Sequence, residues 1–341
     1  MHPDFDLNPE RVGPYELGEP LGVGGMAEVF KAEHVDRPGE CLALKRILRH
    51  LARDPRFVDM FRDEARISSS LTHPNIVSVL DFGSDAGELY LALEYVDGQS
   101  LAKLLRHVAA QKRRFPLSIA LFIAREMLRG LAYAHSATDA QGQKFNLIHR
   151  DVSPGNILLG NDGCVKITDF GIVRSTVVDR RTRPGEVKGK LGYMSPEQVV
   201  GQDVDPRSDL FSVGIILTEM LLARPLFSGK SDLEILTRTH QADVSLLERF
   251  APSLRPDLTR VLFKALARKP EDRFQCADDF LSVIEIVGRR AGVALRQETF
   301  AQWMLQFGAP PERKMSGTRE VVRTQRSSCP ATTREPKAQN Q

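Results

Sequence analysis

The stretch LIHRDVSPGNILLGNDGCVKITDFG, residues 147–171, decides the fold of this chain. Residues 157–159 and 164–168 are mostly β-branched and aliphatic, which predicts two short strands. The Asn-Asp-Gly sequence at 161–163 lies between them and supplies residues that tolerate the positive φ of a tight turn. We therefore expect the two strands to pair as a β-hairpin.

Three side chains that carry oxygen ligands flank this hairpin. Asp151 and Asn156 precede it and Asp169 follows it, so the hairpin returns Asp169 to the neighbourhood of the other two. Two carboxylates and a carboxamide at one point suit Mg²⁺, a hard cation that shares its oxygen ligands with phosphates. Where two of these three side chains bind the metal, the remaining one can orient and deprotonate an attacking hydroxyl.

The motifs around these side chains occur together in one known family. His-Arg-Asp at 149–151 with Asn156, followed by Asp-Phe-Gly at 169–171, resembles the catalytic loop and metal-binding motif of protein kinases. Either tripeptide alone is a common chance match, whereas both at this spacing with a hairpin between them are not. The chain therefore resembles a Hanks-type serine/threonine protein kinase.

The resemblance covers about residues 13–290 and implies an α+β fold with two lobes. We expect a small lobe at 13–97, a mostly antiparallel β-sheet with one helix, and a larger, mainly helical lobe at 98–290. The other expected divisions are an irregular lead-in at 1–12, an activation segment at 169–197, a helical extension at 291–308 and a disordered basic tail at 309–341. The expected helices span 55–70, 100–111, 117–136, 258–268, 277–289 and 298–306, and a hairpin of strands is expected at 76–82 and 89–94.

A glycine-rich stretch, GVGGMAEV at 22–29, follows a predicted strand that begins at Tyr15. Glycines let the backbone approach phosphates and direct its N–H groups at them, although a lone glycine cluster is more often a simple turn. The stretch departs from G-x-G-x-x-G, since Ala27 takes the third position and Gly25 is extra. It resembles the form found in bacterial members of the family.

The resemblance implies that ATP binds between the lobes. Val29 and Ala43 are expected to pack on the adenine ring, and Leu93 to close the back of its pocket. The backbones of Glu94 and Val96 are expected to bond the adenine edge. The full expected ATP-binding set is Leu21, Gly22, Val23, Gly24, Gly25, Met26, Ala27, Glu28, Val29, Ala43, Lys45, Leu93, Glu94, Val96 and Leu158.

Lys45 ends a predicted strand at 42–45, where the family has its phosphate-binding lysine. A lysine on a strand is usually a solvated surface group, but alternation puts Ala43 and Lys45 on the face that the glycine loop would cover. Lys45 is therefore expected to contact the α- and β-phosphates. Glu64 is its ion-pair partner by resemblance, with Asp63 as the alternative; the simpler interpretation is that Glu64 is only a surface charge.

The segment from Gly171 to the Ser-Pro-Glu at 195–197 resembles an activation segment. Arg150 stands where the family has an arginine that binds a phosphate on this segment through bidentate bonds. We expect autophosphorylation here, and the candidate phosphate acceptors are Ser175, Thr176 and Thr182.

Three further residues have structural roles by resemblance. Asp209, near the start of the buried central helix of the large lobe, is expected to brace the backbone of the catalytic loop. Glu197 is expected to pair with Arg273.

Two positions depart from the family pattern, and together they suggest that a lysine and a hydroxyl residue have exchanged places. Ser153 stands where serine/threonine kinases usually have a catalytic-loop lysine, and Lys190 stands where they usually have threonine. We expect Lys190 to reach back and supply the missing charge, with Ser153 as its hydrogen-bond partner. The alternative is a weakened or inactive kinase in which Lys190 is an exposed charge. No arginine lies between Asp151 and Asn156, so the exchange gives no support to tyrosine specificity.

The amino-acid composition is consistent with a protein kinase. The net charge of +3 comes from 47 basic and 44 acidic residues, which makes no case for a nucleic-acid or membrane partner. Four scattered cysteines are expected to be reduced thiols. Neither an N-terminal apolar segment nor a run of about 18 apolar residues is found, so we expect a cytoplasmic protein.

The predicted reaction is transfer of the ATP γ-phosphoryl group to a protein Ser or Thr hydroxyl, as part of bacterial signalling. Asp151 would be the base, Asn156 and Asp169 would hold Mg²⁺ or Mn²⁺, and protein substrates would be the partners, with self-association for trans-autophosphorylation. Two alternatives are a pseudokinase scaffold, supported by Ser153, and a small-molecule phosphotransferase, which the activation segment and Arg273 disfavour.

Overall fold

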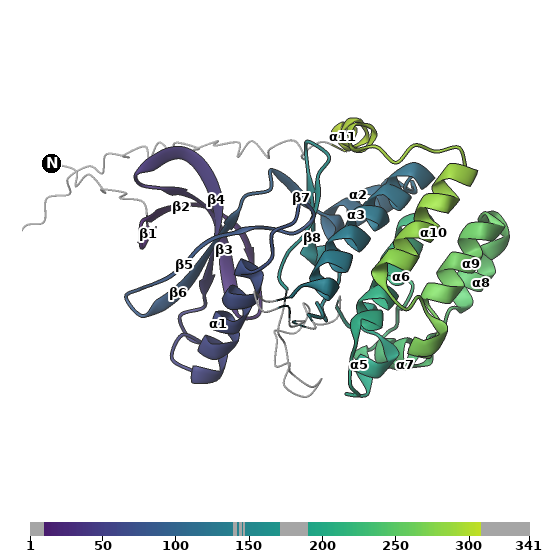
Figure 1. Ribbon diagram of the computed structural model, residues 1–341, viewed down its shortest axis with the longest axis horizontal. Helices are drawn as coiled ribbons and strands as arrows, with labels where there is room; N and C mark the ends of the chain where they lie inside the picture. The colour runs from purple at the N-terminus through teal and green to yellow at the C-terminus, as the bar shows by residue number, and fades with distance from the viewer. Residues whose placement is uncertain (1–9, 139–141, 143–144, 146, 171–189, 308–341) are drawn as a thin grey trace, which may run out of the picture. The chain divides into compact units, whose positions relative to one another are not determined.

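A computed structural model describes residues 10–138, 142, 145, 147–170 and 190–307 of the chain. The chain divides into a unit at 1–307 and a second unit at 308–341. The second unit, and with it the expected tail, lies outside the described residues. Within the first unit, strands gather in the N-terminal part and helices in the C-terminal part (Figure 1). The expected fold with a sheet lobe and a helical lobe is confirmed.

The small lobe is built on a six-stranded antiparallel sheet of order β1-β2-β3-β4-β6-β5. Alternate residues of β4 face opposite sides, so Leu42 and Leu44 pack with Tyr15 while Ala43 and Ile47 face the other way. The strands are β1 Arg11–Val12, β2 Tyr15–Val23, β3 Ala27–His34, β4 Arg37–Ile47, β5 Val79–Asp85 and β6 Glu88–Glu94. β1 lies within the expected irregular lead-in, where its two residues pair with β2.

One helix, α1 Pro55–Ser69, packs against this sheet (Figure 1). Asp54 caps its N-terminus, since the Asp54 side chain accepts a hydrogen bond from the Arg56 backbone N at 3.0 Å, and proline occupies the first turn. Its buried face carries Phe61 and Glu64. The helix predicted at 55–70 is confirmed.

The predicted strand at 76–82 begins later, at Val79. The reason is a competing partner: the Val77 backbone N donates to the Ile167 carbonyl at 2.9 Å, and the Ile167 N donates to the Asn75 carbonyl at 2.9 Å. Residues 75–77 therefore pair with the hairpin that leads to Asp169 instead of extending the small-lobe sheet.

The hairpin predicted from the central stretch forms, as β8 Ile157–Gly160 and β9 Val165–Ile167. Of the three turn residues only Gly163 has positive φ, at 86°, which corrects the expectation for Asn161 and Asp162. Asp162 contributes through its side chain, which accepts from the Cys164 N at 2.9 Å.

A third strand, β7 Gly98–Ser100, pairs with β8 and had no signal in the sequence because it is so short. A Cβ at Gly98 would collide with the Leu159 carbonyl, so this close pairing requires glycine.

Helices α3 and α6 form the centre of the large lobe, and α10 packs on α3 (Figure 1). Nearly every residue of α6 is buried, as expected for a helix that is apolar on all sides. After α10, α11 packs Phe300 and Trp303 against the α3 region. The helices are α2 Leu101–Ala110, α3 Leu117–Ser136, α5 Pro196–Val199, α6 Pro206–Leu222, α7 Asp232–Gln241, α8 Ser245–Phe250, α9 Pro256–Ala265, α10 Ala277–Arg290 and α11 Gln297–Leu305.

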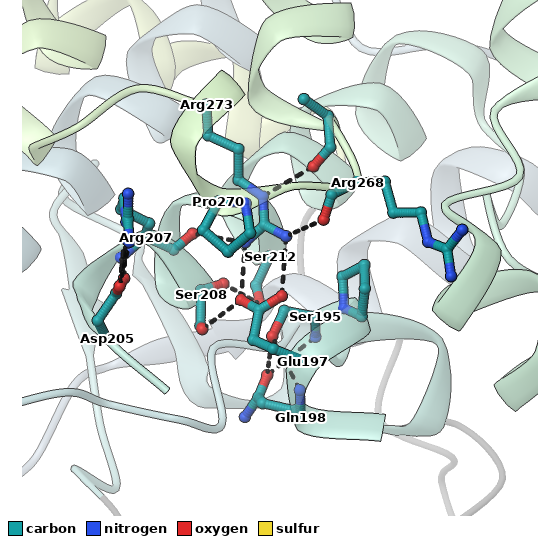
Figure 2. A network of polar contacts seen from close by, with 12 residues as sticks. Ser195, Glu197, Gln198, Asp205, Arg207, Ser208, Ser212, Arg268, Pro270 and Arg273 are labelled. Atoms are coloured by element: carbon teal, nitrogen blue, oxygen red, sulfur yellow. Dashed lines mark hydrogen bonds and ion pairs between the residues drawn. The ribbon is translucent and has the colours of Figure 1, made fainter. Parts of the chain in front are cut away.

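A buried ion pair joins the end of the activation segment to the large lobe (Figure 2). Arg273 binds both carboxylate oxygens of Glu197, at 2.7 and 2.8 Å, and also donates to the carbonyls of Ala267 and Arg268. Ser208 Oγ donates to the same carboxylate at 2.5 Å. Burial opposes the charge of Glu197, but the hydrogen bonds from Arg273 and Ser208 hold its pKa below the usual range. The expected contact is present.

Arg273→Ala should therefore lower the free energy of unfolding by about 3–5 kcal/mol, because it leaves the Glu197 carboxylate buried without its partner. Thermal and urea unfolding would measure the loss. The matched control is Arg289→Ala, whose side chain is 70% exposed. A loss in Arg273→Ala no larger than in the control would contradict this role.

Candidate active site

Lys45 on β4 joins the two lobes through a pair of carboxylates. Its Nζ donates to Glu64 Oε1 on α1 at 2.5 Å and to Asp169 Oδ1, just after β9, at 2.7 Å. Lys45 and Glu64 are buried, whereas the Asp169 side chain is 39% exposed. The predicted partner Glu64 thus contacts Lys45, and no ion pair between Asp63 and Lys45 occurs among the described residues.

The three charges shift one another's pKa values. Burial opposes the charge of Lys45, but the two carboxylates raise the pKa of its ammonium. Burial raises the pKa of Glu64 against the opposing effect of Lys45. At Asp169 the attraction of Lys45, assisted by Lys190, outweighs burial and lowers the pKa. Lys45 is therefore a fixed cation, and Asp169 remains charged at neutral pH.

Asp209, near the start of α6, binds the backbone of the catalytic loop through its carboxylate. Its carboxylate oxygens accept from the backbone N of His149 and of Arg150, both at 2.9 Å. His135, at the end of α3, contacts the same carboxylate through Nε2 at 2.8 Å. Burial opposes the charge, but the contact with His135 and those with the loop keep the pKa of Asp209 low. The bracing contacts expected of Asp209 are present; the sequence carried no signal for His135.

Asp151 is surrounded by two donors that share one of its oxygens. Lys190 Nζ donates to Oδ2 at 2.6 Å, and Asn156 Nδ2 donates to Oδ2 at 3.0 Å and to the Asp151 carbonyl at 2.8 Å. Oδ1 has no hydrogen-bond partner among the described residues. It is therefore the oxygen available to an incoming hydroxyl.

The expected hydrogen bond between Ser153 and Lys190 does not form. Ser153 Oγ is buried and has no hydrogen-bond partner in the described part of the chain, while Lys190 donates to Asp151. This expectation was wrong because the carboxylate beside Lys190 is a stronger acceptor than a hydroxyl.

An apolar cluster contains residues from both lobes. Ala43 and Leu93 belong to one cluster with Ala27, and Val29, Val96 and Leu158 pack against it. Five of these residues come from the small lobe and its connection, whereas Leu158 lies on β8. Side chains predicted to surround an adenine ring therefore lie together.

Glu94, the last residue of β6, uses both its backbone N and its side chain within the protein. Its N donates to the Ser78 carbonyl at 2.9 Å, and its side chain pairs with Lys166 at 2.8 Å. The Glu94 N is therefore engaged within the protein and is not free for the expected bond to the adenine edge.

The glycine loop joins β2 to β3 through a turn closed by the Gly24 N and the Ala27 carbonyl at 2.7 Å. A Cβ at Gly22 would meet nothing within 4 Å, so the protein's own packing does not require glycine there. A close approach by a ligand would require it. The Glu28 side chain pairs with Arg46 at 2.7 Å, so its carboxylate is engaged within the small lobe. Of the other expected loop residues, Leu21 and Val23 are exposed, and Gly25 and Met26 form the turn.

The donor set fits Mg²⁺ with a nucleotide phosphate. The Asn156 amide nitrogen is engaged by Asp151, so its oxygen is the available ligand, and Lys45 binds only one oxygen of Asp169. Among the described residues no three His, Cys, Asp or Glu side chains form a metal cluster, so phosphate and water would have to complete the metal shell.

Arg150 has positive φ, at 64°, and its buried Nε has no hydrogen-bond partner within the described residues. The predicted acceptors Ser175, Thr176 and Thr182 lie outside those residues.

The sequence did not predict the hydrogen bonds of the buried Glu219 carboxylate, which lies beside the site. The Tyr193 hydroxyl donates to Glu219 Oε2 at 2.6 Å, and the Leu226 N donates to Glu219 Oε1 at 2.9 Å. Burial raises the pKa of Glu219 to about 7 despite these bonds. A glutamate within an apolar helix pattern was the one signal in the sequence.

Comparison with known proteins agrees with this geometry. The family model for the protein kinase domain matches residues 15–282, and this chain belongs to the protein kinase family. It is 40% identical over 275 residues to the tyrosine-protein kinase MasK of Myxococcus xanthus, covering 80% of this chain and 43% of MasK. It is 38% identical to the probable serine/threonine-protein kinase SCO3848 of Streptomyces coelicolor, covering 81% and 40% of the two chains. It is 35% identical to the serine/threonine-protein kinase PrkC of Bacillus subtilis, covering 78% and 39%.

The chain thus spans less than half the length of these three relatives. In the part of the chain that the structure describes, no helix is both long and apolar enough to cross a membrane.

Glu219 should make stability depend on pH. Its folded pKa of about 7 exceeds the ordinary 4.5, so the folded protein keeps a proton that the unfolded chain releases. The free energy of unfolding should therefore fall by about 3 kcal/mol as pH rises from about 5 to 8. Glu219→Gln should remove this part of the slope in urea titrations at several pH values, whereas exposed Glu248→Gln should keep it. An unchanged slope in Glu219→Gln would refute the assignment.

Proposed function

We propose that this protein is a serine/threonine protein kinase that transfers the γ-phosphoryl group of ATP to protein hydroxyls in bacterial signalling. The observation that carries the proposal is the convergence of Lys45, Asp151, Asn156 and Asp169 at the meeting point of the two lobes. Phosphoryl transfer depends mainly on positioning and electrostatic stabilisation, and these residues supply both.

Each residue has a distinct task in this proposal. When bound, Mg-ATP supplies the transferable phosphoryl group and the metal charge. Lys45, held by Glu64, orients the phosphates, and Asn156 and Asp169 would hold the metal. Asp151 Oδ1 orients the substrate hydroxyl and accepts its proton.

Lys190 is proposed as the cation that other family members carry in the catalytic loop. Its ammonium lies 2.6 Å from Asp151 Oδ2, beside the point where the hydroxyl must arrive. A cation there stabilises charge that develops on the transferring group. The pseudokinase alternative rested on the missing lysine at position 153, and a cation supplied by Lys190 removes that support. The family match and the Glu197–Arg273 pair count against a small-molecule phosphotransferase.

Regulation by autophosphorylation is the second part of the proposal. Arg150 has a buried guanidinium nitrogen without a partner among the described residues, which supports a role in binding phosphate on the activation segment. Ser175, Thr176 and Thr182 remain the proposed acceptors, with transfer between two copies of the chain.

The first test is transfer of label from γ-labelled ATP to the protein itself and to a generic protein substrate. Asp151→Asn should lower the rate by about 10²–10⁴-fold, because it removes the proton acceptor. Mass mapping should place the self-label on Ser175, Thr176 or Thr182, and phosphoamino-acid analysis should give phosphoserine or phosphothreonine. No transfer by the unmodified protein would overturn the proposal, and phosphotyrosine alone would overturn its acceptor specificity.

A second test isolates Lys190. Lys190→Met should lower kcat by about 100-fold or more at unchanged ATP affinity, because the preorganised cation is lost. Lys190→Thr with Ser153→Lys should recover part of the rate by restoring the family arrangement. The thermal midpoint checks folding in each variant. Full turnover in Lys190→Met would exclude the relocated cation.

A further inference from the structure

A cleft of about 750 Å³ lies beside the catalytic loop. Its walls come from α2, from residues 153–155 of the loop, from Lys190 and Tyr193, and from the end of α6. Val23 of the glycine loop also lines it. Because Lys190 contacts both the cleft and Asp151, a chain bound here would pass directly beside the proposed base.

The charged residues in this cleft are mostly cations. Arg106 on α2 and Arg224 after α6 are exposed, and neither forms an ion pair within the described residues. The Arg224 guanidinium lies 5.5 Å from the centre of the Phe250 ring, which holds it in place and leaves its N–H groups for an anion. Lys190 is the third cation that lines the cleft, and its ammonium is paired with Asp151, so Arg106 and Arg224 are the two cations open to a ligand.

Glu219 is the one carboxylate among the residues that line the cleft, and it does not offset these charges. It is buried, and both of its oxygens already accept hydrogen bonds, from the Tyr193 hydroxyl and from the Leu226 N. Burial also raises its pKa to about 7, so its negative charge is incomplete at neutral pH. The cleft therefore presents positive charge to whatever enters it.

We propose that this cleft binds an acidic segment of the protein substrate, so that the enzyme prefers Ser or Thr flanked by Asp and Glu. The inference rests on the proposed kinase function and adds the substrate class. Apolar walls formed by Leu105, Ala109 and Pro225 would pack along the bound chain, while Arg106 and Arg224 would pair with its carboxylates.

The chain's own activation segment does not match this preference. Residues 172–190 contain six Lys and Arg residues against Asp179 and Glu186. Self-labelling would then depend on the high local concentration in a self-associated pair, not on cleft complementarity. Acidic peptides should be the better substrates in dilute solution.

The test compares three peptides with the same Ser acceptor, flanked by Asp and Glu, by Gln, or by Lys and Arg. The acidic peptide should have a kcat/KM at least about tenfold above the basic one, since like charges in the cleft are disfavoured. This preference should shrink in about 0.5 M salt, because exposed charges are screened. A fourth peptide with phosphoserine in the flanks distinguishes carboxylates from phosphates as the preferred anion.

The variant Arg106→Gln with Arg224→Gln should reduce the ratio of acidic to neutral peptide about fivefold or more, because two exposed cations are lost. The matched control is exposed Arg260→Gln on α9, outside the cleft, which should keep the ratio. Equal or better use of the basic peptide, or an unchanged ratio in the double variant, would overturn the inference. Loss of transfer to every peptide and to the protein itself would instead overturn the proposed function.

Discussion

The ammonium of Lys45 between Glu64 and Asp169 is the interaction on which the rest of the site depends. The three charges come from the small-lobe sheet, from α1 and from the segment after β9, so the contact forms only when all three elements are docked. A buried cation is stable only with such partners, because its desolvation is costly. The arrangement of the two lobes and the position of the Lys45 ammonium therefore depend on each other.

A second buried charge, the Asp209 carboxylate, fixes the backbone of the catalytic loop. Asp209 lies on a helix that is buried on all sides, which makes it a rigid support. Arg150 and Asp169 both have positive φ, a conformation that costs energy in residues other than glycine and that persists only where the surroundings enforce it. The loop geometry is thus held by polar contacts inside an otherwise apolar core.

The position of Lys190 illustrates how chemistry depends on place in space and not on place in the sequence. Residue 190 is 39 positions from Asp151, yet its ammonium contacts that carboxylate. The relatives of this chain are named for different acceptor residues: MasK is named a tyrosine kinase, whereas SCO3848 and PrkC are named serine/threonine kinases. Lys190 also lines the cleft, so its ammonium connects Asp151 to that cleft.

The sequence by itself determined the family, the two-lobed fold and the hairpin of β8 and β9, because short motifs at set spacing encode local geometry. Most boundaries of long periodic helices, such as α3, were predictable for the same reason. The motifs also named the partners in the Lys45–Glu64 and Glu197–Arg273 pairs, but only the tertiary structure decided the polar contacts that no motif names. It assigned His135 to Asp209, left Ser153 without a described partner, and brought Arg106 and Arg224 to one cleft. Such pairings depend on the packing of elements distant in sequence, which no local pattern encodes.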